Sequence, residues 1–121
     1  YNASPDSVAA ALSVLMEMEA RRRYAVLGDM LEMGAFAPKA HYETGKKVAE
    51  SGIDVLVALG ELSRHTVQGA IDAGMDRAKV FHCMEQGEGI TYLKPFLGPR
   101  DAVLIKGSRG MGMERMADAL A

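Results

Sequence analysis

The chain has 121 residues, of which 49% are apolar, a formal net charge of −2 at pH 7 and a single cysteine. This length suits one domain with its own core, and the small negative charge argues against a general attraction to nucleic acid or anionic membranes. One cysteine excludes an internal disulfide and a cysteine-rich zinc site, which fits a reducing, cytoplasmic setting.

Helical patterns and short apolar runs alternate along the chain. Ser4-Pro5 is a helix-start signal, and apolar residues at spacings of three and four predict a first helix through about Glu19. The same reasoning predicts strands at 24–27, 55–59, 79–83 and 102–105, with helices at 38–51, 63–73, 85–97 and 114–121. This order predicts an α/β fold: a Rossmann-like three-layer domain with a mainly parallel sheet and helices on both faces.

Several single residues carry structural predictions. Ser63 is the expected cap of the third helix. Gly45 lies inside the second helix, where glycine costs up to about 1 kcal/mol relative to alanine, so we expect close backbone packing there. Arg21-Arg22-Arg23 is interpreted as a solvated strand entry rather than a phosphate patch, and Cys83 as an inert core thiol.

Polar residues follow the first and fourth strands. Asp29 and Glu32 come after the first strand, and Lys106-Gly107-Ser108-Arg109-Gly110 comes after the fourth. The carboxyl ends of parallel strands share one edge of the sheet, where ligands bind in open α/β folds, so we expect an acidic and a basic loop to converge. His41, at the start of the second helix, either faces this edge or is a packing residue.

Taken through Gly112, the basic loop combines two cations, a hydroxyl and three glycines ahead of a helix, which is typical of an anion site. It does not match the glycine loops that cradle nucleotide phosphates, and a glycine-rich turn with surface charges is the alternative. A receiver-type phosphoacceptor domain is rejected, because the third strand ends in His82-Cys83 rather than in an aspartate.

Longer strings are more specific than these spacings. They are Tyr1-Asn2-Ala3-Ser4-Pro5-Asp6-Ser7, Val26-Leu27-Gly28-Asp29-Met30-Leu31-Glu32-Met33-Gly34, His41 with Gly45, and Lys106-Gly107-Ser108-Arg109-Gly110-Met111 with Met113-Glu114. In this order they resemble the C-terminal domain of the Mur ligases over essentially the whole chain. The second and last strings resemble most closely the branch that uses D-alanyl-D-alanine.

The resemblance implies a cytoplasmic ligase of peptidoglycan synthesis, with residues 1–121 as one domain of a longer three-domain chain. In that family ATP and Mg²⁺, bound mainly by the central domain, activate the carboxylate of a UDP-N-acetylmuramoyl-tripeptide as an acyl phosphate. The amine of D-alanyl-D-alanine then attacks it. The expected partners are these substrates and the N-terminal and central domains, with no nucleic acid and no membrane. The chain alone is expected to be inactive.

The resemblance also assigns roles to residues of this chain. Tyr1 and Asn2 would face ATP, although Ser4 stands where the family commonly has asparagine. Substrate contacts would come from the two loops, through Asp29, Met30, Glu32, Lys106, Ser108 and Arg109. The acidic residues would lie beside the dipeptide ammonium or position a neighbouring cation, and the basic loop would meet a carboxylate or phosphate oxygen. No catalytic residue or metal ligand is expected within the chain alone.

Two other functional classes stay open. One is another ligase of the same superfamily, of the folylpolyglutamate or cyanophycin type. The other is a stand-alone module that binds an anionic small molecule without turnover.

Overall fold

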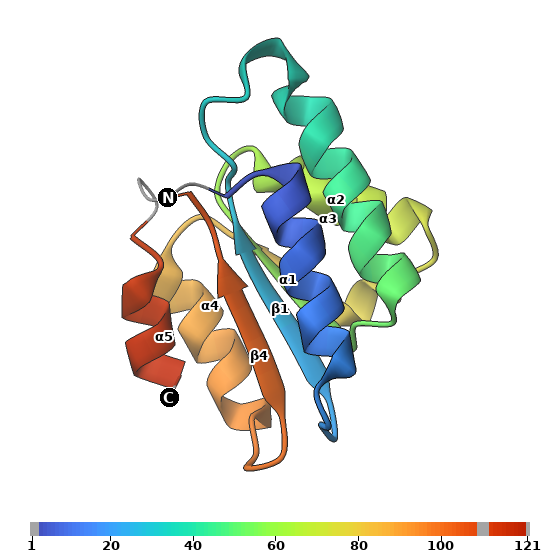
Figure 1. Cartoon of the computed structure of the whole chain (residues 1–121). Coiled ribbons are helices and arrows are strands. Elements are labelled where there is room, and N and C mark those ends of the chain that lie inside the picture. The colour runs from blue at the N-terminus through green and yellow to red at the C-terminus, as the bar shows by residue number, and fades with distance from the viewer. Residues whose placement is uncertain (1–2, 109–111, 121) are drawn as a thin grey trace.

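The centre of the fold is a parallel sheet with the strand order β3-β2-β1-β4. The computed structural model describes residues 3–108 and 112–120. Within them the strands are β1 (Arg23–Gly28), β2 (Val55–Leu59), β3 (Val80–Cys83) and β4 (Ala102–Lys106). β1 pairs in parallel with both β2 and β4, so the chain builds one half of the sheet before it returns to add β4 on the other side (Figure 1). The predicted parallel sheet is confirmed.

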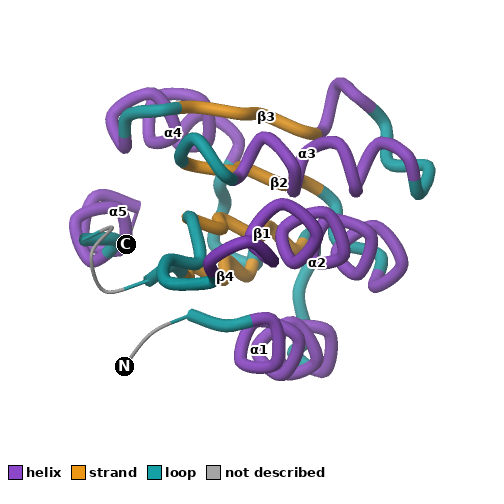
Figure 2. Tube along the Cα trace, turned by 90° about the horizontal axis from the view of Figure 1, so that it is seen from above, coloured by secondary structure: helices purple, strands orange, loops and turns teal. Residues whose placement is uncertain are grey.

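Helices cover both faces of this sheet, which confirms the predicted three layers (Figure 2). The helices are α1 (Pro5–Glu17), α2 (Ala37–Ser51), α3 (Ser63–Asp72), α4 (Gln86–Leu93) and α5 (Glu114–Leu120). Short 3₁₀ turns lie at Gly34–Phe36, Arg77–Lys79 and Lys94–Phe96. Helices α1 to α3 share one core with the sheet, and α4 and α5 share the other. None of the helices in the described ranges has the length and apolar character that crossing a membrane requires.

Strand β1 is buried on both of its faces. Ala25 and Leu27 belong to the core beneath α1 to α3, whereas Tyr24 and Val26 belong to the core beneath α4 and α5. A strand covered on both sides needs apolar residues at every position rather than at alternate ones. This explains why the apolar run from 24 to 27 indicates a buried strand.

The ends of α1 are held by side chains. Ser7 N–H donates to Ser4 Oγ at 3.2 Å and Ser4 N–H donates to Ser7 Oγ at 2.9 Å, so the predicted cap is confirmed. At the other end, Arg23 donates to the carbonyl oxygens of Leu15 and Met18. Arg21 forms an ion pair with Asp101 at 3.0 Å. Two of the three consecutive arginines therefore hold helix α1 and the turn before β4.

Helices α2 and α3 touch through their backbones. A Cβ atom added to Gly45 would lie 1.9 Å from the carbonyl oxygen of Thr66, and one added to Gly69 would lie 1.9 Å from that of Tyr42. Atoms cannot approach so closely, so only glycine fits at these two positions. The close packing predicted at Gly45 is confirmed.

Cys83 lies at the end of β3 and is 3% exposed. Burial raises the pKa of its thiol to about 11, which keeps the unreactive protonated form at neutral pH. The prediction of a core thiol is confirmed.

Candidate functional site

The loops after β1 and β4 meet at the carboxyl edge of the sheet, as predicted. Leu27 lies opposite Lys106 in the parallel pairing of the two strands. From this edge the chain leaves β1 toward α2 on one face and leaves β4 toward α5 on the other. Adjacent strands whose connections diverge in this way form the crevice where ligands bind in open α/β sheets.

Glycines allow the two loops to touch. A Cβ atom on Gly107 would lie 3.2 Å from the Cα atom of Gly28 and 2.9 Å from Cγ of Met113. The backbone N–H of Ser108 donates to the carbonyl oxygen of Asp29 at 3.1 Å. The glycines of both strings therefore serve the contact between the loops.

The carboxylate of Asp29 is turned toward the start of α3. One of its oxygens accepts hydrogen bonds from the N–H of Ser63 at 2.8 Å and from its hydroxyl at 2.7 Å, and the other accepts from the N–H of Leu62 at 3.3 Å. Gly60 makes room for it, because a Cβ atom there would lie 2.4 Å from the carboxylate. The free N–H groups and the partial positive charge of a helix start stabilise an anion.

This arrangement corrects two expectations. Ser63 is the first residue of α3 rather than its cap, and Asp29, in the loop after β1, supplies the capping carboxylate. Asp29 is only 6% exposed, and its carboxylate oxygens face the start of α3 rather than open solvent. The sequence-based expectation had been a carboxylate directed toward a ligand. It orders the acidic loop and the β2–α3 turn together.

Met30 and His41 tie the acidic loop to α2. Met30 is 2% exposed, so its side chain belongs to the core and does not form the wall of an open site. Its N–H donates to Nε2 of His41 at 2.9 Å. His41 is 1% exposed, and its Nδ1 lies 2.7 Å from the carbonyl oxygen of Ala37. His41 is therefore a packing residue, which was one of its two sequence-based interpretations. It also holds the acidic loop after β1 in place.

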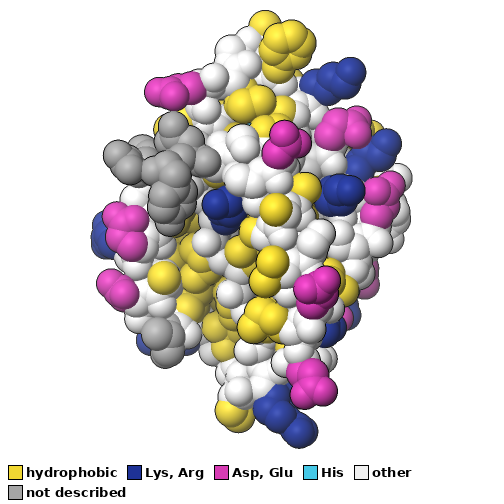
Figure 3. Space-filling model, in the orientation of Figure 1, with side chains coloured by type: hydrophobic (Ala, Val, Ile, Leu, Met, Phe, Trp, Pro, Cys, Tyr) yellow, Lys and Arg dark blue, Asp and Glu magenta, His cyan; other side chains and the backbone are white. Residues whose placement is uncertain are grey.

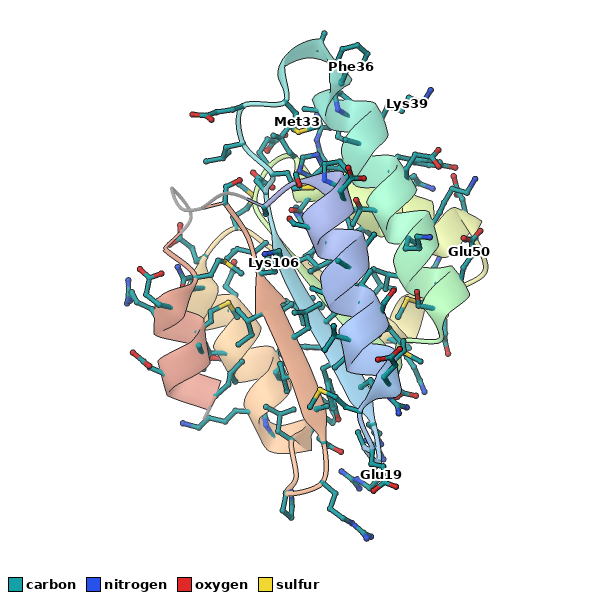
Figure 4. The ribbon with its side chains drawn as sticks, viewed as in Figure 1. Glu19, Met33, Phe36, Lys39, Glu50 and Lys106 are labelled. Atoms are coloured by element: carbon teal, nitrogen blue, oxygen red, sulfur yellow. The ribbon has the colours of Figure 1, made fainter. Side chains whose placement is uncertain are left out.

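Glu32 is the exposed acidic residue of this loop and has a left-handed backbone with φ of 65°. Side-chain-bearing residues rarely adopt this conformation. Beyond it the loop runs through Met33 to Phe36, whose side chain is 75% exposed. Figure 4 shows Met33 and Phe36 on a loop that extends past the end of the sheet, on the same side as Lys106.

The basic loop borders a groove of about 420 Å³. The groove lies along the outer side of β4 between α1 and α5, and its lining is Ala11, Leu104, Ile105, Lys106, Gly107, Ser108, Met113, Glu114 and Ala117. Lys106 is half-buried there, and apolar side chains gather along this edge (Figure 3). Ser108 is 1% exposed, and its Oγ accepts the N–H of Leu31 at 2.7 Å. The hydroxyl therefore joins the two loops.

Three of the sequence-derived candidates, Tyr1, Asn2 and Arg109, lie outside the described residues. Among the residues that are described, no three His, Cys, Asp or Glu side chains are grouped so that they could hold a metal ion. Sequence reasoning missed the capping role of Asp29 and the clamp at His41. Both depend on contacts between segments that are distant in the sequence, and no local pattern indicated either of them.

Comparison with known proteins adds the family context. The sequence profile of the family described as "Mur ligase, glutamate ligase domain" matches residues 1–109. The UDP-N-acetylmuramoyl-tripeptide--D-alanyl-D-alanine ligase of Bacillus subtilis is 32% identical over 121 residues, which covers 99% of this chain and 26% of that protein. A crystal structure of MurF from Acinetobacter baumannii superposes with a TM-score of 0.87 at 30% identity, covering 99% of this chain and 26% of its own.

The MurF ligase from Thermotoga maritima, solved in complex with ADP, has a TM-score of 0.80 at 21% identity, with the same coverage. That likeness supports the fold alone. The chain thus spans about a quarter of the length of the relatives that it matches.

Proposed function

The chain belongs to the Mur ligase family, and from this we propose that it is the C-terminal domain of a ligase joining D-alanyl-D-alanine to a UDP-N-acetylmuramoyl-tripeptide. One observation carries the proposal: the acidic and basic loops, whose strings resemble that branch of the family, meet at the switch point of the sheet. The names of the relatives support the same substrates.

The proposed reaction has two steps. The γ-phosphoryl group of ATP passes to the terminal carboxylate of the tripeptide, which gives an acyl phosphate and ADP. The neutral amine of the dipeptide then attacks the acyl carbon, so that a C–N bond forms, a proton is lost and inorganic phosphate leaves. The first step belongs to the other domains of the protein. We assign Mg²⁺ to those domains too, as the resemblance to the family implies.

The domain described here would receive the dipeptide. This acceptor carries an ammonium group at one end and a carboxylate at the other, so it needs a negative and a positive contact. Glu32 is exposed on the acidic loop, and Lys106 lines the groove beside the basic loop. We assign the ammonium to Glu32 and the carboxylate to Lys106, with Asp29 and Ser108 holding the loops. Arg109, Tyr1 and Asn2 keep their family-based roles as proposals.

The test is an acceptor panel with the full-length protein. ADP release and amide product are measured with UDP-N-acetylmuramoyl-tripeptide and ATP, with D-alanyl-D-alanine, aspartate or arginine as the acceptor, and separately with a folate and glutamate. We expect product only from the tripeptide with the dipeptide. Product from folate and glutamate would assign a folylpolyglutamate ligase instead. Tight calorimetric binding of an anionic ligand to the 121-residue chain, without turnover by the full-length protein, would favour a binding module.

A further inference from the structure

The acidic loop is fixed at three successive residues. The carbonyl oxygen of Asp29 accepts the N–H of Ser108 at 3.1 Å. The next N–H, of Met30, donates to Nε2 of His41 at 2.9 Å, and the one after it, of Leu31, donates to Oγ of Ser108 at 2.7 Å. The clamps thus come from the loop after β4 on one side and from α2 on the other, and they stop directly before Glu32.

The bond geometry specifies the protonation of His41. Nδ1 lies 2.7 Å from the carbonyl oxygen of Ala37, which can only accept, so Nδ1 carries a hydrogen. Nε2 accepts the N–H of Met30, so Nε2 carries none. The buried ring is therefore neutral, in the Nδ1–H tautomer, and the bond to Ala37 orients the acceptor nitrogen.

Glu32 follows these clamps in a backbone conformation that glycine adopts far more readily. Its φ is 65°, and its side chain is exposed rather than packed. A strained residue of this kind persists only where its surroundings hold it, and such residues cluster at functional sites. Nothing about local folding requires glutamate here, since the turn could be made with glycine.

We propose that His41 is a positioning residue for the acceptor amine: its neutral imidazole fixes the Met30 backbone, and through it the direction in which Glu32 presents its carboxylate. The inference rests on the proposed function of the acidic loop. His41 touches no substrate. It acts by keeping the backbone of residues 29–32 in the one arrangement that aims Glu32 outward.

Two substitutions separate this role from simple packing. In His41→Gln the side-chain amide reaches the position of Nε2 and its oxygen accepts the Met30 N–H. In His41→Asn the shorter amide reaches only the position of Nδ1, so the bond to Ala37 is kept and the Met30 N–H loses its partner. Both variants keep a polar side chain at this buried position, and they are compared in the full-length ligase.

We expect His41→Asn to raise the KM for D-alanyl-D-alanine about tenfold, because an unmet buried N–H frees the loop. In His41→Asn the KM values for ATP and for the UDP-tripeptide stay within about twofold of wild type. In His41→Gln all three KM values stay within about threefold of wild type, because the Met30 N–H keeps an acceptor at the position of Nε2. Equal effects of the two variants, or an equal rise in all three KM values, would overturn the inference.

A second measurement uses the wild-type protein, so its result does not depend on whether a variant folds. The ¹⁵N chemical shifts of selectively labelled histidine in the full-length wild-type protein distinguish an Nδ1–H ring from an Nε2–H ring or a cation. The Nδ1–H signature for His41 is expected, and either other form would refute the clamp. If the wild-type enzyme does not use the dipeptide, the proposed function fails, whereas the tautomer measurement still decides whether His41 holds the loop.

Discussion

The backbone contact between α2 and α3 makes Gly45→Ala a sharp test of the packing. The new methyl carbon would lie 1.9 Å from the carbonyl oxygen of Thr66 and 2.8 Å from the N atom of Ala70. Both are backbone atoms, so no side chain can rotate away, and α3 itself must move. Gly69 contacts the backbone of Tyr42 in the reciprocal sense, so a shift of either helix disturbs both contacts.

The expected change in the free energy of unfolding of Gly45→Ala follows from two opposing effects. Overpacking of a well-packed contact costs about 1–3 kcal/mol and sometimes more. Replacement of glycine by alanine within a helix returns up to about 1 kcal/mol. Because the clash is with backbone, we expect a net loss of about 2 kcal/mol or more, which lowers the Tm of a domain of this size by about 8 °C.

The assay is thermal unfolding followed by circular dichroism, with Gly87→Ala as the matched control. Gly87 also lies in a helix, α4, but a Cβ atom there would meet nothing within 4 Å. That variant should be neutral or more stable by up to about 1 kcal/mol. Wild-type stability in Gly45→Ala would show that the two helices do not approach as closely as described.

Three further changes test other parts of the structure. Asp29→Ala leaves the N–H groups at the start of α3 without their acceptor and should lower the free energy of unfolding by about 2–3 kcal/mol in urea titrations; Asp76→Ala, which removes an exposed cap from a 3₁₀ turn, should cost less than about 1 kcal/mol. Glu32→Gly relieves a left-handed backbone and should raise stability by up to about 1 kcal/mol while it raises the KM of the full-length enzyme for the dipeptide; a loss of stability would show that the conformation is not strained. Hydrogen bonding from the Arg21 guanidinium lowers the pKa of Asp101 below its ordinary value of 3.8, so this carboxylate stabilises the fold above that pH and loses its contribution as the pH falls through the lowered folded-state pKa. Urea unfolding from pH 7 to pH 3 should therefore show a deficit in Asp101→Asn that is constant near neutral pH and shrinks as the pH falls below 3.8, and a deficit independent of pH would contradict the ion pair.

Sequence patterns predicted the parts of the fold that depend on local chemistry. The apolar run from 24 to 27 identified β1 because a doubly covered strand cannot tolerate polar positions. Gly45 predicted close packing because a glycine within a helix needs a compensating contact. The shared edge of the two loops followed from parallel pairing alone.

The features that the sequence did not predict depend on contacts between segments that are distant in the chain. The carboxylate that holds the start of α3 comes from the loop after β1, 34 residues away, and no local signal connects Asp29 with Ser63. The left-handed residue was also not predictable. Gly34 is the natural place for positive φ in this loop and adopts it, but Glu32 does so as well, because its neighbours are clamped.

In the proposed ligase, the loops after β1 and β4 receive the acceptor dipeptide. Hydrogen exchange of the full-length protein tests it most directly, with the UDP-tripeptide and a non-hydrolysable ATP analogue bound, and with D-alanyl-D-alanine either added or left out. We expect slower exchange on addition of the dipeptide in peptides that cover residues 29–36 and 106–108. Unchanged exchange there, with protection confined to the other domains, would contradict it.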